Sequence, residues 1–359
     1  MTKQEFFGAP DSVPFAEITV IIHGPILKEA VVGSPLGMTY EVVQSVRQVL
    51  PGAKLVISTW AGSEAEGFGA EQVVYSSDPG GNPYGPGERP NNVNRQIVAM
   101  RAGLERIDTR WALKLRSDTK LVSASMVKLW PRYQERNPCF KVFERRVTTS
   151  ALLTYDARLC FGTKLFTPFF FHVNDMIQFG LTSDLRRLWC IPLMPLEDFN
   201  CFSAEALKLK GGYEKISNRR VPEDYIWTSA LKTAGFTTND SWMDFKPGLL
   251  PVSELSIVNN FQLLDHEDMG FHCLKYPNFD RDFPIGMPFF THRSWLSYYQ
   301  LYCDPLVEVP KYEPFTLKSL RRSLLRGFNP FRVLQYLKYL TRSFRYRIKE
   351  AARRMMLWK

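Results

Sequence analysis

The sequence of 359 residues lacks the features that mark several classes of protein. It has no apolar run near the roughly 20 residues that a helix needs to cross a bilayer. Its first residues, MTKQEFFGAPDSVPF, contain neither the basic nor the apolar segment of a secretory signal. Its six cysteines include no C-x-x-C pair, which argues against a disulfide framework and a zinc site. These absences predict a protein of a reducing, cytoplasmic environment.

The residues that are present are those of an ordinary folded protein with an unusual end. Apolar residues make up 45% and charged residues 23% of the sequence, which excludes disordered and low-complexity classes. The formal net charge is +10, but residues 318–359 alone hold thirteen basic residues and one acid, a charge of +12. The other 317 residues carry 33 basic and 35 acidic residues. We therefore expect a near-neutral globular body followed by a strongly basic C-terminal segment.

Short β-branched runs alternate with helical periodicity through the first third of the chain. Apolar and β-branched residues predict strands over 18–23, 55–59, 73–75 and 111–116. Before the fourth strand, apolar residues recur at three- and four-residue steps and predict a helix over 92–107. This alternation predicts an α/β fold, in which ligands bind beyond the carboxyl ends of the parallel strands.

The fourth predicted strand carries three charged residues on one face. Lys114, Arg116 and Asp118 alternate with Leu113 and Leu115, which point to the other face. Two cations and a carboxylate near the end of a central strand are costly to bury without partners. They suit either a charged substrate at the ligand edge of the sheet or a structural salt-bridge cluster in which Asp118 is a turn residue.

A glycine- and proline-rich loop leads into the helix predicted from residue 92. Arg95 and Gln96 lie in its first turn, where backbone N–H groups and the helix dipole favour an anion. The loop matches neither the P-loop pattern nor the dinucleotide pattern G-x-G-x-x-G, so ATPases and NAD-dependent enzymes lose their main support. A capped surface helix is the alternative interpretation.

Two adjacent carboxylates stand at another predicted helix start. Glu223 and Asp224 follow Pro222, and proline at the first helical position with acids behind it is typical of a helix N-terminus. One of the two carboxylates could accept a proton from a hydroxyl group if it projects into a cleft. From spacing alone, acids that merely stabilise the helix start are an equally good interpretation.

Polar side chains also interrupt two apolar runs further along the chain. His172, Asn174 and Asp175 lie within FFFHVNDM, and His272 lies within GFHCLKY. Polar side chains in such surroundings need hydrogen-bond partners or a ligand. A lone histidine there is more often a hydrogen-bonded core residue than a metal ligand.

Five motifs, taken in order along about residues 17–275, resemble the WavE family of lipopolysaccharide-synthesis proteins. Each motif is only moderately specific, but the ordered set is a stronger signal. The motifs are TVIIHGPI, NNVNRQIV, WALKLRSD, FHVNDMIQFGLTSD and PEDYIW.

The resemblance implies a GT-A-like, Rossmann-like fold with a mixed, mostly parallel sheet flanked by helices. It also implies a glycosyltransferase that moves a sugar from a nucleotide-sugar donor to lipopolysaccharide or another surface polysaccharide. In that fold a short acidic motif after the central strand holds the nucleotide diphosphate, usually through Mn²⁺ or Mg²⁺. Asp118 is the matching position here, with His272 as a second candidate ligand. The segment R-S-D has one carboxylate where the D-x-D pattern has two, so Lys114, Arg116 or Arg95 are alternative partners of the diphosphate.

The candidate site follows from the residues and the resemblance together. The residues expected to bind the nucleotide sugar are His23, Gly24, Thr59, Asp78, Asn94, Arg95, Gln96, Lys114, Arg116, Ser117 and Asp118. Those expected to contact the substrate are His172, Asn174 and Asp175. Glu223 and Asp224 look like the E-D pair that supplies the base in many inverting enzymes of such folds. We expect Asp224, or alternatively Glu223, to take the proton of the acceptor.

The chain is expected to divide into one domain and a basic appendage. A GT-A-like domain over 16–303 would comprise a nucleotide-binding half, 16–120, and an acceptor half, 121–303. A linker over 304–317 would lead to basic amphipathic helices over 318–359. These helices are predicted to bind an anionic membrane surface at the inner face of the cell membrane. The acceptor would then be lipid-linked or a polysaccharide.

Two alternative functions, from classes other than glycosyltransferases, remain open from the sequence. One is a non-catalytic, membrane-associated polysaccharide-assembly protein that retains the fold. The other is a nucleic-acid binder that uses the basic segment. The near-neutral body has no recognised nucleic-acid motif, so no nucleic-acid partner is expected.

Overall fold

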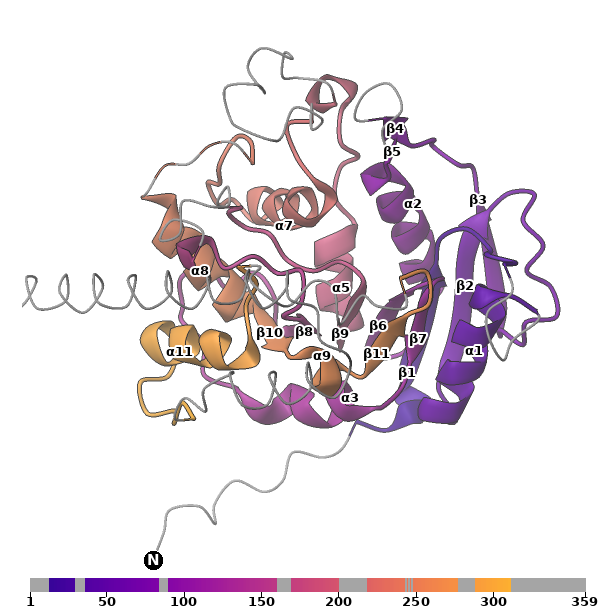
Figure 1. The fold of residues 1–359 in the computed structure, drawn as a ribbon, viewed down its shortest axis with the longest axis horizontal. Coiled ribbons are helices and arrows are strands. Elements are labelled where there is room, and N and C mark those ends of the chain that lie inside the picture. Colours follow the sequence, from indigo (N-terminus) through magenta and orange to yellow (C-terminus); the bar gives the residue numbers. More distant parts are fainter. Residues whose placement is uncertain are drawn as a thin grey trace, which may run out of the picture.

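A seven-stranded sheet forms the centre of the molecule, and helices cover both of its faces (Figure 1). The strand order across the sheet is β10-β8-β9-β6-β1-β2-β3. The basic segment 318–359 and residues 311–317, the second half of the predicted linker, lie outside the described residues. The computed structural model describes residues 13–29, 36–83, 90–159, 169–199, 218–242, 244, 246, 248–276 and 288–310.

The first half of the sheet is parallel, as the sequence predicts. It consists of β1 (Ile18–His23), β2 (Lys54–Trp60), β3 (Gln72–Ser76) and β6 (Trp111–Arg116). β1 pairs in parallel with both β2 and β6, and β2 with β3. The carboxyl ends of all four strands therefore meet at one edge of the sheet, which is where an α/β fold binds ligands.

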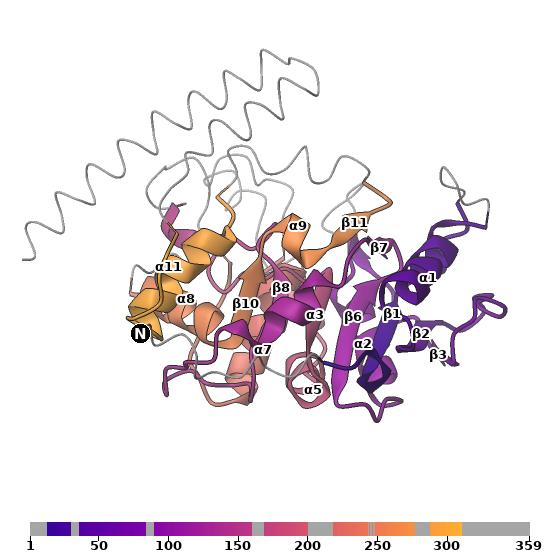
Figure 2. The ribbon, with the colours of Figure 1, turned by 90° about the horizontal axis from the view of Figure 1, so that it is seen from below.

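Two amphipathic helices cover opposite faces of this half (Figure 2). They are α1 (Met38–Val49) and α2 (Val93–Leu104). Val42 and Val46 of α1 pack with Val20 and other residues of one face, whereas the apolar residues of α2 pack against the other. Gly103 permits this close packing, because a Cβ there would lie 2.6 Å from Ile21 Cγ2.

The second half makes the sheet mixed. β9 (Ile177–Leu181) runs antiparallel to both β6 and β8 (Val147–Ser150), and β10 (Phe261–Leu264) is parallel to β8. The predicted fold class, a mixed and mostly parallel sheet flanked by helices, is confirmed. The longer helices of this half are α5 (Thr182–Trp189), α7 (Pro222–Thr233), α8 (Leu249–Asn260) and α11 (His292–Tyr302).

Several short elements complete the described structure. The most important for the site are β7 (Thr119–Leu121) and β11 (Phe271–Cys273), which pair antiparallel and hold residues 271–273 beside the end of β6. The others are η1 (Phe15–Glu17), β4 (Asn82–Pro83), β5 (Pro90–Asn91), α3 (Ser125–Leu129), η2 (Trp130–Arg132), η3 (Leu196–Asp198) and α9 (His266–Met269).

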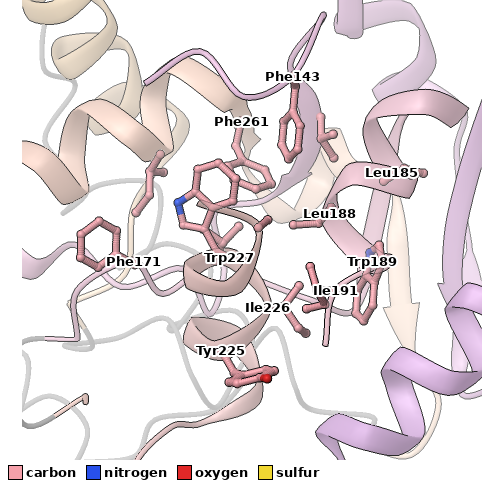
Figure 3. Close-up of a cluster of buried hydrophobic side chains, with 14 of the residues drawn as sticks. Phe143, Phe171, Leu185, Leu188, Trp189, Ile191, Tyr225, Ile226, Trp227 and Phe261 are labelled. Carbon is pink, nitrogen blue, oxygen red and sulfur yellow. The ribbon is translucent and has the colours of Figure 1, made fainter. Parts of the chain in front are cut away.

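Aromatic side chains join the second half to the sheet (Figure 3). The ring of Trp227 in α7 makes an edge-to-face contact with Phe261 of β10, with ring centroids 4.8 Å apart. Phe143 contacts both rings. These contacts fix the start of α7 relative to the sheet. None of the helices in the described part of the chain is long and apolar enough to cross a bilayer.

Candidate functional site

The ends of β1 and β6 bring the first group of predicted residues together. His23 is the last residue of β1 and pairs in register with Arg116, the last residue of β6. Gly24 then turns the chain with φ of +120°, and a Cβ at this position would lie 3.0 Å from Ser117 Oγ. The backbone N–H of Ser117 donates to the His23 carbonyl at 3.0 Å. The turn after β1 and the turn after β6 are thus built against each other.

Asp118 forms an ion pair with Arg116 through both carboxylate oxygens. Arg116 Nε lies 3.1 Å from Asp118 Oδ1, and Arg116 Nη2 lies 2.6 Å from Oδ2. The Thr119 hydroxyl also donates to Oδ1 at 3.3 Å. Burial alone would lower the pKa of Arg116, but the charges of Asp118 and Asp175 raise it above its usual range. The salt-bridge interpretation of this strand is therefore correct for Arg116 and Asp118.

Lys114, the third charged residue of the strand, has no such partner. Its side chain is fully buried, and within the described structure its Nζ makes no hydrogen bond. The ammonium group lies 4.5 Å from the centre of the Trp189 ring, an arrangement that stabilises a cation. Burial is the main cause that lowers the pKa of Lys114 to about 7, and Asp175 and Glu223 oppose the shift.

His23 lies on the same face as Lys114 and shares its environment. Its ring lies 6.3 Å from that of Trp189, and its buried Nε2 has no hydrogen-bond partner among the described residues. Burial, followed by the charges of Lys114 and Arg116, holds the pKa of His23 well below its usual value. His23 is therefore neutral at physiological pH, and its free nitrogen can bond to a ligand.

Asp224, the base first expected, has a structural role at the start of α7. Its side chain is fully buried; Oδ1 accepts the N–H of Val221 and Oδ2 accepts Arg220 Nη1, both at 2.9 Å. Burial raises the pKa of Asp224 to about 6, against the opposing effect of Arg220. Both oxygens are used to cap the helix and hold Arg220.

Glu223 faces the opposite way, into the polar cluster. Its Oε2 lies 3.9 Å from His172 Nε2, and 26% of its side chain is exposed. Burial, followed by the negative charge of Asp175, raises the pKa of Glu223 to about 8, although Arg116 opposes the shift. Glu223 is therefore the carboxyl group of the pair that a substrate can reach.

The segment before β9 supplies the other side of the cluster. This segment follows Phe171, whose φ of 56° lies in the left-handed region. The backbone N–H of Val173 donates to the Glu223 carbonyl at 3.4 Å, which connects the segment to the start of α7. His172 is buried, its Nδ1 has no hydrogen bond within the described structure, and burial lowers its pKa to about 4. Asn174 is engaged locally, because its side chain donates to the Leu152 carbonyl at 2.8 Å.

Asp175 is the central carboxylate of the cluster. The antiparallel register pairs Ile177 with Leu115, so Asp175, two residues before β9, lies near the end of β6. Its charge acts on both Lys114 and Glu223, as their pKa shifts show. The side chain is only slightly exposed, and no hydrogen bond holds it within the part of the chain that the structure describes.

The residues predicted at the outer strands form a separate group. Arg95 and Asp78 make an ion pair, with Nε–Oδ1 and Nη2–Oδ2 distances of 2.7 and 2.6 Å, and this pair lowers the pKa of Asp78. Asn94 bonds to the backbone of residue 194 through both ends of its amide. Thr59 Oγ1 donates to Ser63, and the buried Oε1 of Gln96 has no partner in the described structure. Of this group, Gln96 is the one with a buried polar atom free for a ligand.

The donor atoms around Asp118 do not fit a divalent cation as they stand. Both Asp118 oxygens are bonded to Arg116, and His272 of β11 lies opposite Lys120 in the β7–β11 register. Among the described residues, no three His, Cys, Asp or Glu side chains are grouped so that they could hold a metal ion. We therefore derive no step through Mn²⁺ or Mg²⁺.

Three residues that shape the site were not predicted from the sequence. Trp189 ends α5 and covers Lys114, Gln178 accepts the indole N–H of Trp189 at 2.8 Å, and Arg220 holds Asp224. Gln178 in β9 pairs with Lys114 in register. A polar residue inside the apolar run MIQFGL was the available signal for Gln178, whereas nothing in the sequence indicated Trp189.

Comparison with known proteins gives one extensive match. A family described as WavE lipopolysaccharide synthesis matches residues 18–329 of the chain. A search of curated proteins found no match.

Solved structures give only distant matches. One is the galactosyltransferase LgtC in complex with donor and acceptor sugar analogs, at 13% identity over 59% of this chain and 70% of that chain, with a TM-score of 0.30. Another is a 4-diphosphocytidyl-2C-methyl-D-erythritol synthase from Anaerococcus prevotii, at 9% identity, 61% and 98% coverage and a TM-score of 0.30. A cytidylyltransferase from Leptospira borgpetersenii gives 14% identity, 65% and 93% coverage and a TM-score of 0.27. These values are too low to transfer an activity.

Proposed function

This chain belongs to the WavE lipopolysaccharide-synthesis family, and from that premise we propose that it is a glycosyltransferase of the GT-A type. It would move a sugar from a nucleotide-sugar donor to a lipopolysaccharide or other surface-polysaccharide acceptor. The observation that carries the proposal is the cluster of ionisable residues at the carboxyl edge of β1 and β6. Buried polar groups without partners are rare in folded proteins, and here Lys114, His23 and His172 each have one.

The diphosphate of the donor fits the end of β6. Among the described residues, Lys114 Nζ and His23 Nε2 on this face are buried nitrogen atoms without partners, and the side chain of Arg116 beside them is 29% exposed. Phosphate oxygens accept hydrogen bonds from such groups. We assign Lys114, His23 and Arg116 to the diphosphate, with Ser117 and Gly24 forming the turn beneath it.

The carboxylates fit the sugar and the acceptor. The charge of Asp175 acts on Lys114 of β6 and on Glu223, so we assign Asp175 to the transferred sugar, near the carbon that becomes positively charged in the transition state. Glu223 is assigned as general base in place of Asp224, because both oxygens of Asp224 are occupied.

The reaction is then a displacement at the anomeric carbon. The acceptor hydroxyl loses its proton to the Glu223 carboxylate, and its oxygen forms the new bond to the sugar. The bond from the anomeric carbon to the phosphate oxygen breaks, and its electron pair leaves with the nucleoside diphosphate. The positive charges of Arg116 and Lys114 stabilise that leaving group.

A panel of nucleotide sugars tests the proposal, with and without Mn²⁺ or Mg²⁺. At least one donor should raise the melting temperature of the protein and be hydrolysed slowly or transferred. Lys114→Met should weaken donor binding, because it removes a buried cation without adding volume. Failure of every donor to bind would contradict the enzyme assignment and favour a non-catalytic assembly protein that retains the fold.

Attachment to the inner face of the membrane is also part of the proposal. The sequence of residues 318–359 supports it, since thirteen basic residues accompany an apolar helical periodicity. A lipid-linked acceptor would meet the site most readily on a protein held at that surface.

A further inference from the structure

A second basic site lies away from the nucleotide-sugar site. A hollow of about 320 Å³ opens between η2 and the segment that leads into β8. Three arginines and one lysine line it, against a single acid, Glu144. The four cations are Arg136, Lys141, Arg145 and Arg146.

The hollow and the proposed active site are on opposite edges of the sheet. Arg146 immediately precedes β8, which is antiparallel to β9, as β6 is. β8 therefore runs in the same direction as β6, and its first residue lies at the amino edge. The proposed donor site lies at the carboxyl edge, beyond Arg116. A ligand in the hollow is thus not the reacting part of the donor.

The buried Arg146 and the half-buried Arg136 donate their hydrogen bonds to neutral oxygen atoms. Arg146 is 4% exposed and donates to the carbonyls of Tyr133, Glu135 and Val258 at 2.7–2.9 Å. Arg136 donates to the side-chain oxygens of Asn259 and Asn260 at 3.2 and 3.3 Å. These bonds fix the guanidinium groups in place but supply no negative charge.

The exposed cations are also without carboxylate partners. Arg145 bonds to the amide oxygen of Gln134, and within the described residues neither Arg145 nor Lys141 forms an ion pair. Elsewhere in the molecule, buried or half-buried arginines such as Arg116 and Arg158 pair with acids through two hydrogen bonds. Within the described residues, the hollow therefore gathers four cations, none of which is paired with a carboxylate.

We infer that this hollow binds a phosphate group carried by a sugar or a lipid. Guanidinium groups that are already fixed in place, as those of Arg136 and Arg146 are, lose little entropy when an anion binds them. The volume exceeds that of phosphate alone and leaves room for part of the molecule that carries it. The pKa of Arg136, which burial and the neighbouring Arg146 lower to about 10, agrees with a charge that lacks compensation.

The inference is tested on the full chain with a double variant at the exposed cations. Lys141→Gln with Arg145→Gln removes two positive charges and leaves Arg136 and Arg146, which are held by the surrounding oxygen atoms, in place. The matched control is Lys54→Gln with Arg106→Gln, which removes two exposed charges elsewhere. Inorganic phosphate is titrated by equilibrium dialysis, and vesicles of phosphatidylglycerol or phosphatidylcholine are tested by co-sedimentation.

The Lys141/Arg145 variant should raise the dissociation constant for phosphate roughly tenfold, whereas the control should change it less than about twofold. A selective loss of phosphate binding would indicate a soluble phosphorylated ligand. A selective loss confined to phosphatidylglycerol vesicles would indicate a lipid headgroup. Equal effects of the two double variants, or no effect of either, would overturn the inference. Donor hydrolysis by the Lys141/Arg145 variant is expected to be unchanged, so this test is independent of the proposed reaction.

Discussion

Glu223 and Asp224 are neighbours in the chain, but they have opposite environments and should respond differently to substitution. We expect Glu223→Gln to lower kcat by roughly 10²–10⁴ with little change in donor affinity, because the amide cannot accept the proton. Steady-state kinetics and donor titration measure the two effects. The protein should remain folded, since the Glu223 side chain is partly exposed and no hydrogen bond to it is needed for the helix cap.

Asp224→Asn is the matched control for that variant. It leaves Arg220 buried without its charged partner and should lower the free energy of unfolding by about 3–5 kcal/mol. Urea denaturation measures this loss. A stable Asp224→Asn protein with no activity, together with normal turnover by Glu223→Gln, would restore Asp224 as the base.

The pKa of Glu223 predicts how the reaction depends on pH. Because burial and Asp175 raise this pKa to about 8, Glu223 is mainly protonated at neutral pH. A base must be ionised, so ionisation of Glu223 should make kcat/KM rise with pH up to about 8. Loss of the proton from Lys114, whose pKa is about 7, should lower kcat/KM at higher pH. The charged groups facing Glu223 are Asp175, Asp224, Arg116 and Lys114, with His172 neutral over this range. A profile that is flat between about pH 6.5 and 9 would exclude Glu223 as the base.

The raised pKa of Glu223 also makes the free energy of unfolding depend on pH. The folded-state pKa of Glu223 lies above the model value of 4.5, so the folded protein binds this proton more tightly than the unfolded chain. The contribution of Glu223 to stability therefore falls as pH rises from about 4.5 to about 8. Glu223→Gln removes this dependence and should make the protein more stable than the wild type at pH 8. Urea denaturation at pH 6 and pH 8 checks the difference.

At the scale of elements, the turn between β1 and the following loop depends on Gly24. Its φ of +120° is rarely adopted by residues with a side chain, and a Cβ would lie 3.0 Å from Ser117 Oγ. We expect Gly24→Ala to lower the free energy of unfolding by about 1–3 kcal/mol. It should also weaken donor binding, because the turn after β6 must shift.

Gly62→Ala separates backbone strain from crowding. Gly62 also has positive φ, but no atom lies within 4 Å of the position of a Cβ, so only the backbone penalty of about 1–2 kcal/mol is expected. In the Gly24→Ala protein, a second change of Ser117→Ala should recover part of the lost stability. No recovery in that double variant would show that contact with Ser117 is unimportant.

The first half of the fold was predictable from sequence because its elements have strong local signals. The run Ile18–His23 and the periodic helix that became Val93–Leu104 each form from residues adjacent in the chain. The later strands carry weaker signals. Val147–Ser150 has the sequence VTTS, and Phe261–Leu264 is only four residues long and directly follows a helix. Their identity as strands depends on pairing with residues distant in the chain.

The alternation of side chains along a strand made part of the site predictable, because it places Lys114, Arg116 and Asp118 on one face. The same pattern does not show that Asp118 binds Arg116 while Lys114 has no hydrogen-bond partner among the described residues. Similarly, the PED motif identified a helix start but not which carboxylate faces the cluster. That choice is made by Arg220, whose position depends on tertiary structure.

At the scale of the whole molecule, the charge distribution predicts where the protein resides. In the sequence after residue 333, Leu337, Leu340, Phe344 and Ile348 recur at three- and four-residue steps, with basic residues beside them. This pattern is typical of a helix that lies in a membrane interface. Each basic residue near anionic lipid contributes about 1 kcal/mol, so half of the thirteen would hold the body firmly.

Truncation after Pro314 tests this prediction. The full chain should co-sediment with phosphatidylglycerol vesicles and be released as salt rises, because screening weakens attraction to the surface. The truncated protein should stay in the supernatant with an unchanged melting temperature, since it retains Val307 and Val309, which pack against the apolar core. A full-length variant with Arg342, Arg345 and Lys349 changed to glutamine keeps the apolar residues and should bind with intermediate affinity. Unfolding of the truncated body, or equal vesicle binding by all three proteins, would mean that residues 318–359 pack against the body and do not anchor it.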